Sequence, residues 1–250
     1  MKLTIFYTLL LFGTTLPCFS QEPDETIIIS GKVTDFNGVP IDSAFVQLKH
    51  ANFSEAYHTY SDAQGNFQLE VKKGRYLAMY VLRLKEYPRN NAVPDQDMRL
   101  EFWAWNIVAH KDLVINPRYH RLELYGVNIF QIERAFMIYV RPMSLGKLLR
   151  YGKDITTDKA KTDEIADVSV KPEHFKVKVF ANEKPVKINS VQRVEEFAGE
   201  GNPPSIGYLL HVSPDPMPEK PYTVFRIWAT NLEFDEQGEN LYFYEVKDYK

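Results

Sequence analysis

A run of short alternating segments between residues 27 and 85 constrains the fold of this chain more than any other feature. Apolar side chains recur at every second position, as at Ile27, Ile29 and Val33, and mostly polar side chains occupy the positions between. This period of two is typical of β-strands with one buried face. Turn-forming residues separate the strands at 35–38, 61–66 and 72–74. Strands at this spacing predict an antiparallel β-sandwich rather than alternating strands and helices.

The composition is compatible with packed cores and bounds the number of domains. The chain has 250 residues, of which 44% are hydrophobic and 14% aromatic. This length favours one large or two medium domains, and the hydrophobic content argues against disorder. Residues 1–20 contain Lys2 as their only charged side chain, so the remainder has 29 basic and 33 acidic residues and a net charge of −4. We therefore expect no basic surface for nucleic acid.

The same stretch carries the sequence pattern of a known family. The segments SGKVTDFNGVPIDSAFVQL and YSDAQGNFQLEVKKGRY fill the family's positions with Gly31, Val33, Asp35, Gly38, Pro40, Ala44, Val46, Ser61, Asp62, Gly65, Phe67, Gly74 and Tyr76. They resemble the carboxypeptidase regulatory-like domain. The resemblance implies a seven-stranded sandwich related in shape to transthyretin, with a structural or binding role. The matching residues Asp35, Gly38, Asp62 and Gly65 form turns, and the resemblance implies no active site.

The first twenty residues predict export. Lys2 is followed by an apolar run over residues 3–16 and then by small residues, a pattern typical of a signal peptide cleaved after Ser20. The run is too short to cross a membrane as a helix, and no later stretch is long enough. An alternative is a lipid anchor at Cys18, although Pro17 stands where a small residue is usual. Because Cys18 is the only cysteine, we expect no disulfide after cleavage.

The rest of the chain predicts a second domain of the same class. Strand patterns at 101–109, 112–125 and 134–141 are assigned to the first sandwich, which then spans 26–146 with an insertion at 86–100. Residues 147–166 are rich in Lys and Asp and read as a linker. Alternating segments after residue 167 predict a second, Ig-like β-sandwich over 167–250. The predicted fold is all-β, with two sandwiches behind a signal peptide.

Candidate catalytic groups are sparse. His120 and Glu123 form an H-x-x-E pattern, which is the zinc-binding sequence motif of metallocarboxypeptidases. On a strand, however, side chains three positions apart point to opposite faces, and zinc needs further ligands. The chain has no G-x-S-x-G sequence and no glycine-rich phosphate loop. We therefore predict no catalytic residues, no metal and no cofactor.

Residues 102–105 (Phe-Trp-Ala-Trp) are the most informative candidate for binding. Alternation places Trp103 and Trp105 on one face of a strand and Phe102 and Ala104 on the other. Two exposed indoles would form a platform for sugar rings, but indoles facing a core or covered by another segment would be structural.

We predict a non-enzymatic, exported binding or scaffolding protein of the bacterial envelope, located in the periplasm, at the cell surface or outside the cell. The envelope placement follows from the family resemblance. Its partner would be an envelope protein or a glycan. The first alternative is a carbohydrate-binding module that uses Trp103, Trp105 and Tyr119. A more distant alternative is a small metal-dependent hydrolase that uses His120.

Overall fold

A computed structural model of the protein describes residues 25–90, 92–154, 167–197, 199–200, 205–218 and 220–246. The predicted signal peptide with Cys18, and most of the predicted linker, lie outside the described residues. Within the described part of the chain, no helix has the length and apolar character needed to span a membrane.

The described residues form an all-β protein with few helices. The strands of the first half are β1 (Thr26–Lys32), β2 (Phe45–Lys49), β3 (Glu55–Tyr60), β4 (Asn66–Lys72), β5 (Gly74–Leu82), β6 (Phe102–Ala109) and β7 (Leu113–Val114). The second half contains β8 (Leu122–Ile132), β9 (Ala135–Ser144), β10 (Phe175–Ala181), β11 (Lys184–Glu196), β12 (Ser205–Ser213), β13 (Tyr222–Asn231) and β14 (Glu236–Glu245). The helices are α1 (Leu145–Asp154) and three 3-10 turns, η1 (Leu84–Glu86), η2 (Pro88–Asn90) and η3 (Asp95–Asp97).

The first sandwich consists of β1 to β7. A three-stranded sheet with the order β4-β1-β7 packs on strands β3-β2-β5-β6. The alternating residues predicted to face inward do so, because Ile29, Val46, Phe67 and Phe102 all lie in this core. The turn predictions are also confirmed. A carboxylate oxygen of Asp62, for example, accepts hydrogen bonds from the backbone N–H groups of Gln64 at 2.9 Å and Asn66 at 2.8 Å.

A glycine from the family pattern permits the close approach of β7 to β1. The two strands pair in parallel, with Ile29 opposite Leu113. A Cβ atom on Gly31 would lie 1.7 Å from the backbone oxygen of Ile115, which no side chain could tolerate. Glycine at this position therefore lets the segment after β7 run alongside β1.

The second sandwich contains two strands that the sequence analysis placed in the first. β8 and β9 pair with each other, and β9 pairs with β12, so both belong with the C-terminal strands. Their inward side chains, including Leu124, Ile129 and Ile138, share a core with Phe225 and Ile227 of β13. The prediction for 112–125 and 134–141 was therefore wrong, except that β7 stays in the first sandwich. Alternation identifies the faces of a strand but not its partner, which explains the error.

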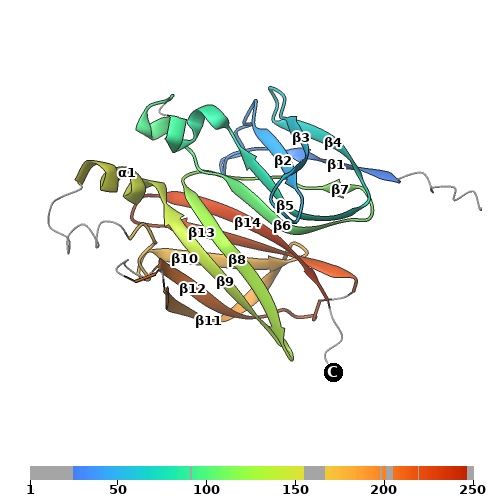
Figure 1. The fold of residues 1–250 in the computed structure, drawn as a ribbon. Helices are drawn as coiled ribbons and strands as arrows, with labels where there is room; N and C mark the ends of the chain where they lie inside the picture. Colours follow the sequence, from blue (N-terminus) through green and yellow to red (C-terminus); the bar gives the residue numbers. More distant parts are fainter. Residues whose placement is uncertain are drawn as a thin grey trace, which may run out of the picture.

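The two sandwiches are built on one continuous sheet. Eleven strands follow one another in the order β3-β2-β5-β6-β14-β13-β10-β11-β12-β9-β8. The two halves meet where β6 and β14 pair in parallel, with Leu241 opposite Ala104, near the middle of the molecule in Figure 1. The long β11 pairs first with β10 and then with β12, so the sheet folds back over itself there.

The two layers that complete the sandwiches lie on opposite faces of this shared sheet. On β14, Leu241 and Phe243 belong to the first core, whereas the neighbouring side chains of Tyr242 and Tyr244 pack against the second. One face is therefore covered by β4-β1-β7 and the other by β8-β9-β12. This offset leaves part of each face without a covering sheet.

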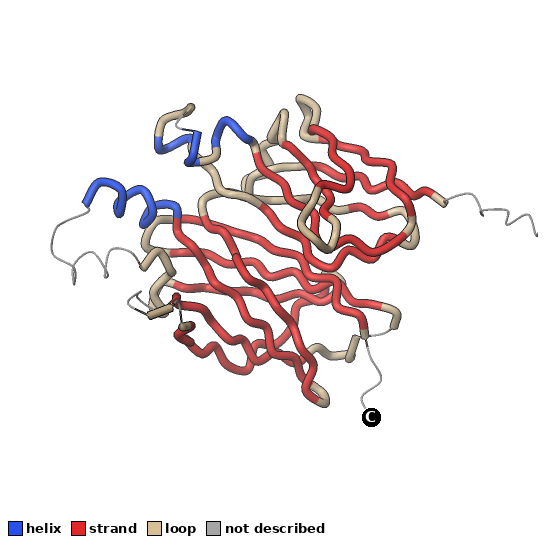
Figure 2. Tube along the Cα trace, viewed as in Figure 1, coloured by secondary structure: helices blue, strands red, loops and turns tan. Residues whose placement is uncertain are grey.

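The helical segments gather at one end of the molecule, as Figure 2 shows. Met98 and Leu100 of the predicted insertion pack with Leu145 of α1 in a small separate cluster. The buried Glu236 holds the start of α1, because its carboxylate accepts hydrogen bonds from Gly146 N and Ser144 Oγ, both at 2.6 Å. The insertion and the helix therefore close this end together.

Candidate functional site

The two tryptophans of β6 lie on the face of the shared sheet that the first sandwich leaves open. Phe102 and Ala104 are fully buried in the first core, while Trp103 and Trp105 point the other way and are half-buried. The predicted alternation is therefore confirmed. Asn106 ends it, because its positive φ of 55° shifts the register and returns Ile107 to the core.

The indoles form part of a row of packed rings that we call the aromatic ladder (Tyr80, Trp103 and Trp105). The Tyr80 and Trp103 ring centroids are 4.4 Å apart, and those of Trp103 and Trp105 are 4.9 Å apart with planes only 9° from parallel. Phe53 approaches Trp105 with its edge, at 6.3 Å. Trp103 thus packs against two other rings, and Trp105 also packs against the second core. The ladder therefore does not present the two open indole faces of a sugar platform.

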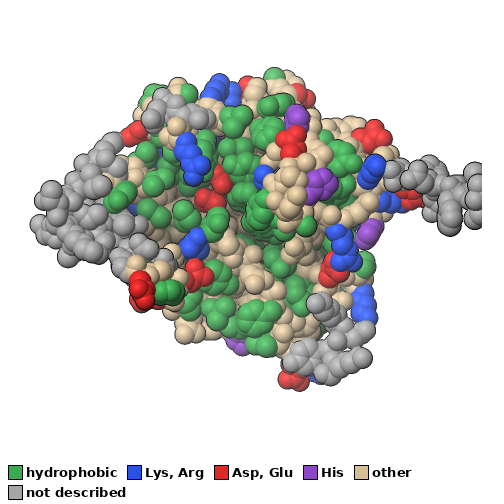
Figure 3. Space-filling model, in the orientation of Figure 1, with side chains coloured by type: hydrophobic (Ala, Val, Ile, Leu, Met, Phe, Trp, Pro, Cys, Tyr) green, Lys and Arg blue, Asp and Glu red, His purple; other side chains and the backbone are tan. Residues whose placement is uncertain are grey.

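A cleft lies along the junction of the two sandwiches, and the rings of the ladder are not part of its lining. This junction cleft has a volume of about 550 Å³, and its lining includes Asn106, the residue after Trp105. Ala51 of the loop between β2 and β3 borders it on one side, and Ile129 and Phe130 of β8 border it on another. Tyr242 of β14 also lines it. Figure 3 shows hydrophobic side chains gathered on the face of the molecule that carries β8.

Two buried carboxyl groups lie at the other end of the ladder. Glu101 accepts hydrogen bonds from Trp103 Nε1 at 3.2 Å and from the Tyr80 hydroxyl at 3.5 Å, which fixes both rings. Burial and the neighbouring Glu101 raise the pKa of Glu123 to about 8. Glu123 is therefore protonated at neutral pH, so the pair avoids the cost of two adjacent buried charges.

The other candidates from the sequence are not part of this site. Tyr119 is 1% exposed and lies in the first core, so it cannot share a ligand surface with the tryptophans. His120 lines a different cavity, and burial lowers its pKa. Glu123 interacts with Glu101 rather than with His120. Among the described residues, no three His, Cys, Asp or Glu side chains are close enough to hold a metal ion.

Sequence reasoning missed Tyr80, Phe53 and Glu101 as members of the site. Tyr80 reaches Trp103 because the two residues are paired across β5 and β6. Phe53 belongs to a hairpin loop and adopts a positive φ of 66°. The signal that could have identified Tyr80 is its place among the outward residues of β5, once the register with β6 is known.

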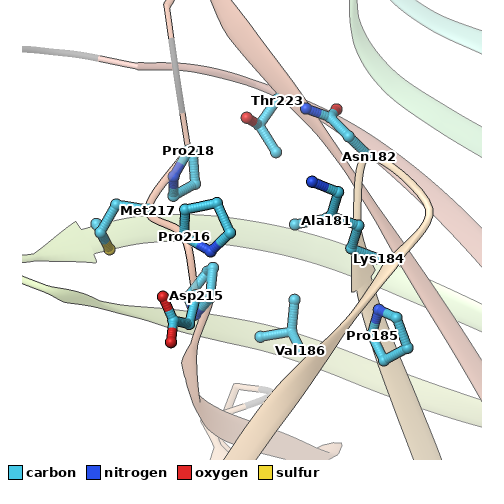
Figure 4. A pocket seen from close by; sticks show the side chains of 11 residues that line it. Ala181, Asn182, Lys184, Pro185, Val186, Asp215, Pro216, Met217, Pro218 and Thr223 are labelled. Atoms are coloured by element: carbon cyan, nitrogen blue, oxygen red, sulfur yellow. The ribbon is translucent and has the colours of Figure 1, made fainter.

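Two smaller concavities lie elsewhere. One of about 160 Å³ is bounded by the proline-rich loop between β12 and β13. Figure 4 shows Pro216 and Pro218 of that loop facing Lys184 and Pro185 at the start of β11. The other, of about 480 Å³, lies beside β7 on the opposite face of the shared sheet, over Leu241 and Phe243. Neither contains an aromatic row comparable to the ladder among the residues described.

Comparison with known proteins gives no family for this chain. No protein-family model matches it, and no curated protein does. The resemblance to the carboxypeptidase regulatory-like domain is therefore not confirmed, although the all-β sandwich fold is.

Several solved structures are similar at low identity. A Bacteroides uniformis protein proposed to bind carbohydrate is 11% identical, with 90% of this chain and 100% of that chain covered and a TM-score of 0.28. A DUF3823 family protein from Bacteroides ovatus is 9% identical, with 88% of this chain and 99% of that chain covered and a TM-score of 0.28. BcpA, the major pilin subunit of Bacillus cereus, is 12% identical, with 89% of this chain and 69% of that chain covered and a TM-score of 0.26. Likenesses this distant leave the function to be argued from the site itself.

Proposed function

We propose that this protein is a non-enzymatic, exported binding protein of the bacterial envelope that holds its partner on the aromatic ladder and in the junction cleft. The observation that carries the proposal is the half-buried Trp103–Trp105 stack, which is followed in the chain by Asn106, a residue that lines a cleft of about 550 Å³. Large aromatic side chains that stay partly exposed beside a concave surface are typical of binding sites.

The groups around the cleft are suited to holding a partner rather than to chemistry. Tyr242 and Phe130 offer apolar area, and Asn106 offers an amide. Phe53 adds an exposed ring beside Trp105. Glu101 is already engaged by Trp103 and Tyr80, and neither Glu101 nor Glu123 is more than 8% exposed. A general acid or base must reach its substrate, which these carboxyl groups do not do in this geometry.

The export of the protein in this proposal rests on the start of the chain. Lys2, the apolar run over 3–16 and the small residues before Gln21 together have the order of an export signal. A protein without cysteine after residue 18 would depend on its two packed cores for stability outside the cell.

Binding to envelope material tests the proposal. Purified protein would be sedimented with insoluble envelope from the producing organism, and the bound fraction measured against concentration. We expect Trp105→Ala to weaken binding at least tenfold, because central aromatic residues contribute about 1–2 kcal/mol or more at interfaces. The matched control is Phe197→Ala, which removes an aromatic side chain that is 84% exposed and lies outside the cleft.

Equal binding by wild type and Trp105→Ala would contradict the proposed site, and no binding by the wild type would contradict the proposed function. Circular dichroism of each variant would confirm that its fold is intact. Trp105 is preferred to Trp103 for this test because Trp103 donates a hydrogen bond to the buried Glu101, whereas the indole nitrogen of Trp105 has no hydrogen-bond partner among the described residues.

The second candidate function is carbohydrate binding at the same place. It is favoured by the mixture of aromatic and polar groups that line the cleft, namely Tyr242 and Tyr244 with Asn106 and the Arg75–Glu245 ion pair. Sugars are held by such combinations of apolar contact and hydrogen bonds. Binding on a glycan array that is lost in Trp105→Ala would support this candidate. Envelope binding that persists after enzymatic removal of polysaccharide would favour a protein partner instead.

A further inference from the structure

Strand β8 is one end of the eleven-stranded sheet, and one of its two edges is left without a neighbouring strand (Figure 1). Among the strands that the structure describes, it pairs with β9 alone, from Leu122 to Ile132. In an antiparallel pair, every second residue of an end strand directs both its N–H and its C=O away from the neighbouring strand. Such outward groups can pair with a further polypeptide strand. The free edge of β8 is therefore a template for strand addition wherever it is accessible.

This edge moves away from β14 along the length of β8. At the start of β8 the two backbones nearly touch, because a Cβ atom on Gly238 of β14 would lie 2.0 Å from the backbone oxygen of Leu122. Further along, side chains make the contact instead, with the Tyr242 hydroxyl 3.5 Å from Asn128 Oδ1. A β-bulge between Tyr125 and Asn128 lies between these points, and bulges bend a strand. The two strands therefore diverge, and space opens between them after the bulge.

Beyond the bulge, the edge of β8 faces the junction cleft. Ile129 and Phe130 line this cleft together with Tyr242 and Tyr244 of β14. Burial raises the pKa values of both tyrosines, and hydrogen bonding from the backbone of Ile129 to Tyr242 and of Gln131 to Tyr244 opposes the rise. The outward N–H groups of Ile129 and Gln131 are thus directed at tyrosine hydroxyls. A strand that enters the cleft would replace a hydroxyl as their partner and would displace no other strand.

The free edge of β8 lacks the protection that end strands usually have. Between Leu124 and Ile132 the strand contains no charged residue and no proline, and Phe130 and Ile132 are 49% and 42% exposed. At the other end of the sheet, β3 carries Glu55 and His58, whose side chains lie 2.6 Å apart. Charged side chains and prolines normally keep foreign strands away from an exposed edge. Their absence from β8 indicates an edge that is used for pairing.

We propose that the junction cleft binds an extended, uncharged segment of a partner protein, which adds to β8 as a further strand. The inference rests on the proposed function and names the chemical class of its partner as polypeptide. A polypeptide backbone matches the regular alternation of N–H and C=O groups along a strand edge, and apolar side chains on alternate positions would fill the aromatic cleft.

The shape and charge of the cleft select this kind of segment. Among the described residues that line it, Arg75 and Glu245 are the charged ones, and they form an ion pair with each other. The bound segment therefore needs no charge of its own. Ala51 and Leu77 of the first sandwich line the same cleft, so the edge of β8 is recessed behind a wall. A single extended segment can enter this space, whereas the end strand of a folded second copy cannot.

Peptides selected from a random dodecapeptide library displayed on phage supply the probe for a direct test. We expect the selected peptides to have few charges and alternating apolar residues, and we would measure their binding by fluorescence anisotropy. Gln131→Pro removes an outward N–H group without affecting the pairing with β9, and should weaken binding at least tenfold. The matched control Gln131→Ala keeps that N–H group and loses only the side chain, so it should bind as the wild type does.

A second pair of variants keeps the test decisive if proline disturbs the fold, which circular dichroism would reveal. Phe130→Lys places a charge in the cleft, and Val191→Lys places one at a similarly exposed position of β11 outside it, where the native side chain is 46% exposed. Only Phe130→Lys should weaken peptide binding, again at least tenfold. Full binding by Phe130→Lys, or equal weakening by Val191→Lys, would overturn the proposal.

Amide exchange followed by NMR provides a readout that a merely structural role of β8 would not change. In the complex with a selected peptide, the N–H groups of Ile129 and Gln131 should exchange with solvent at least tenfold more slowly than in the free protein. Unchanged exchange at both positions would show that the peptide does not pair with β8, and would overturn the proposal.

The envelope sedimentation assay separates this inference from the proposed function. Envelope binding that is weakened by Trp105→Ala but unchanged in Phe130→Lys and Gln131→Pro would overturn strand addition and leave the binding function intact. Binding that survives protease treatment of the envelope and is lost on removal of polysaccharide would overturn it in favour of a carbohydrate. Dimers of the pure protein that Phe130→Lys dissociates would overturn it in favour of a second copy. Peptide pairing with β8 without envelope binding would support the strand site and contradict only the proposed function.

Discussion

Glu101 and Glu123 show how single side chains set the geometry of the site. Glu101 receives Trp103 and Tyr80 as hydrogen-bond donors, so the ladder depends on an acceptor that stays in place. Glu123 can lie beside it only while it is protonated, because its pKa is raised to about 8 by burial and by Glu101. A residue outside the ladder therefore controls its rigidity.

The pair predicts a pH dependence of stability. Since the pKa of Glu123 is higher in the folded state than its usual 4.5, its contribution is complete below about pH 4.5 and is lost as pH rises to about 8. Glu123→Gln mimics the protonated form. Its free energy of unfolding should match that of the wild type near pH 4.5 and exceed it at pH 8.5 by about 2–4 kcal/mol. Urea unfolding at both pH values measures this. The control is Glu70→Gln, on the exposed side of β4. If the free energy of unfolding of Glu123→Gln changed with pH as that of the wild type does, the raised pKa of Glu123 would be contradicted.

At the residue scale, the sequence predicted the faces of residues 102–105 but not their surroundings. The alternation of Phe102 and Ala104 with the two tryptophans follows from strand geometry alone. The packing of Trp103 against Tyr80 and the contact of Glu123 with Glu101 depend on which strands pair and in which register. Those are non-local properties, which is also why Tyr119 was assigned to the wrong surface.

At the scale of elements, loops of the first sandwich are fixed to the second by a cation–aromatic cluster. Arg118 follows β7, and its guanidinium lies 5.3 Å from the Phe36 ring centroid and 4.8 Å from that of Trp228 on β13. The same guanidinium pairs with Glu239 of β14, which is buried. Glu239 also pairs with Arg226 at 2.8 Å.

Arg118→Ala should therefore destabilise the protein by about 2–3 kcal/mol, because it leaves a buried carboxylate with one partner instead of two. The midpoint of urea unfolding measures the loss. Adding Glu239→Gln to the variant should recover part of it, since the unpaired charge is then removed. The control Arg193→Ala breaks an exposed ion pair with Glu195 and should lower the free energy of unfolding only slightly. A loss no larger than this control would show that the cluster is not a structural link.

Sequence patterns predicted most individual strands and turns but not the assignment of β8 and β9. The effect of glycine and asparagine on a turn is local, so the hairpins of the first sandwich could be predicted from the sequence. Besides β8, β9 pairs with β12, which is more than sixty residues away along the chain. No local signal distinguishes that pairing from one with a nearer strand.

At the scale of the whole molecule, the shared sheet makes the two sandwiches one folding unit. The pairing of β6 with β14 joins their cores, and Leu241 and Phe243 of the last strand complete the first core. We therefore expect a single unfolding transition in calorimetry, with equal calorimetric and van't Hoff enthalpies. A fragment of residues 21–150 should be aggregated or unfolded, because it lacks β14. Two separate transitions, or a soluble monomeric fragment, would contradict a shared sheet.

The central claim, that the aromatic ladder and junction cleft form the binding surface, can be tested most directly by site-specific photo-crosslinking. Because Cys18 is the only cysteine, Phe53→Cys or Phe197→Cys in a Cys18→Ser background gives one attachment site for a benzophenone label. Phe53 is 56% exposed beside Trp105, and Phe197 is 84% exposed elsewhere. After irradiation with envelope material from the producing organism, we predict a discrete adduct from position 53 and none from position 197. Adducts of equal yield from both positions, or from neither, would contradict the claim.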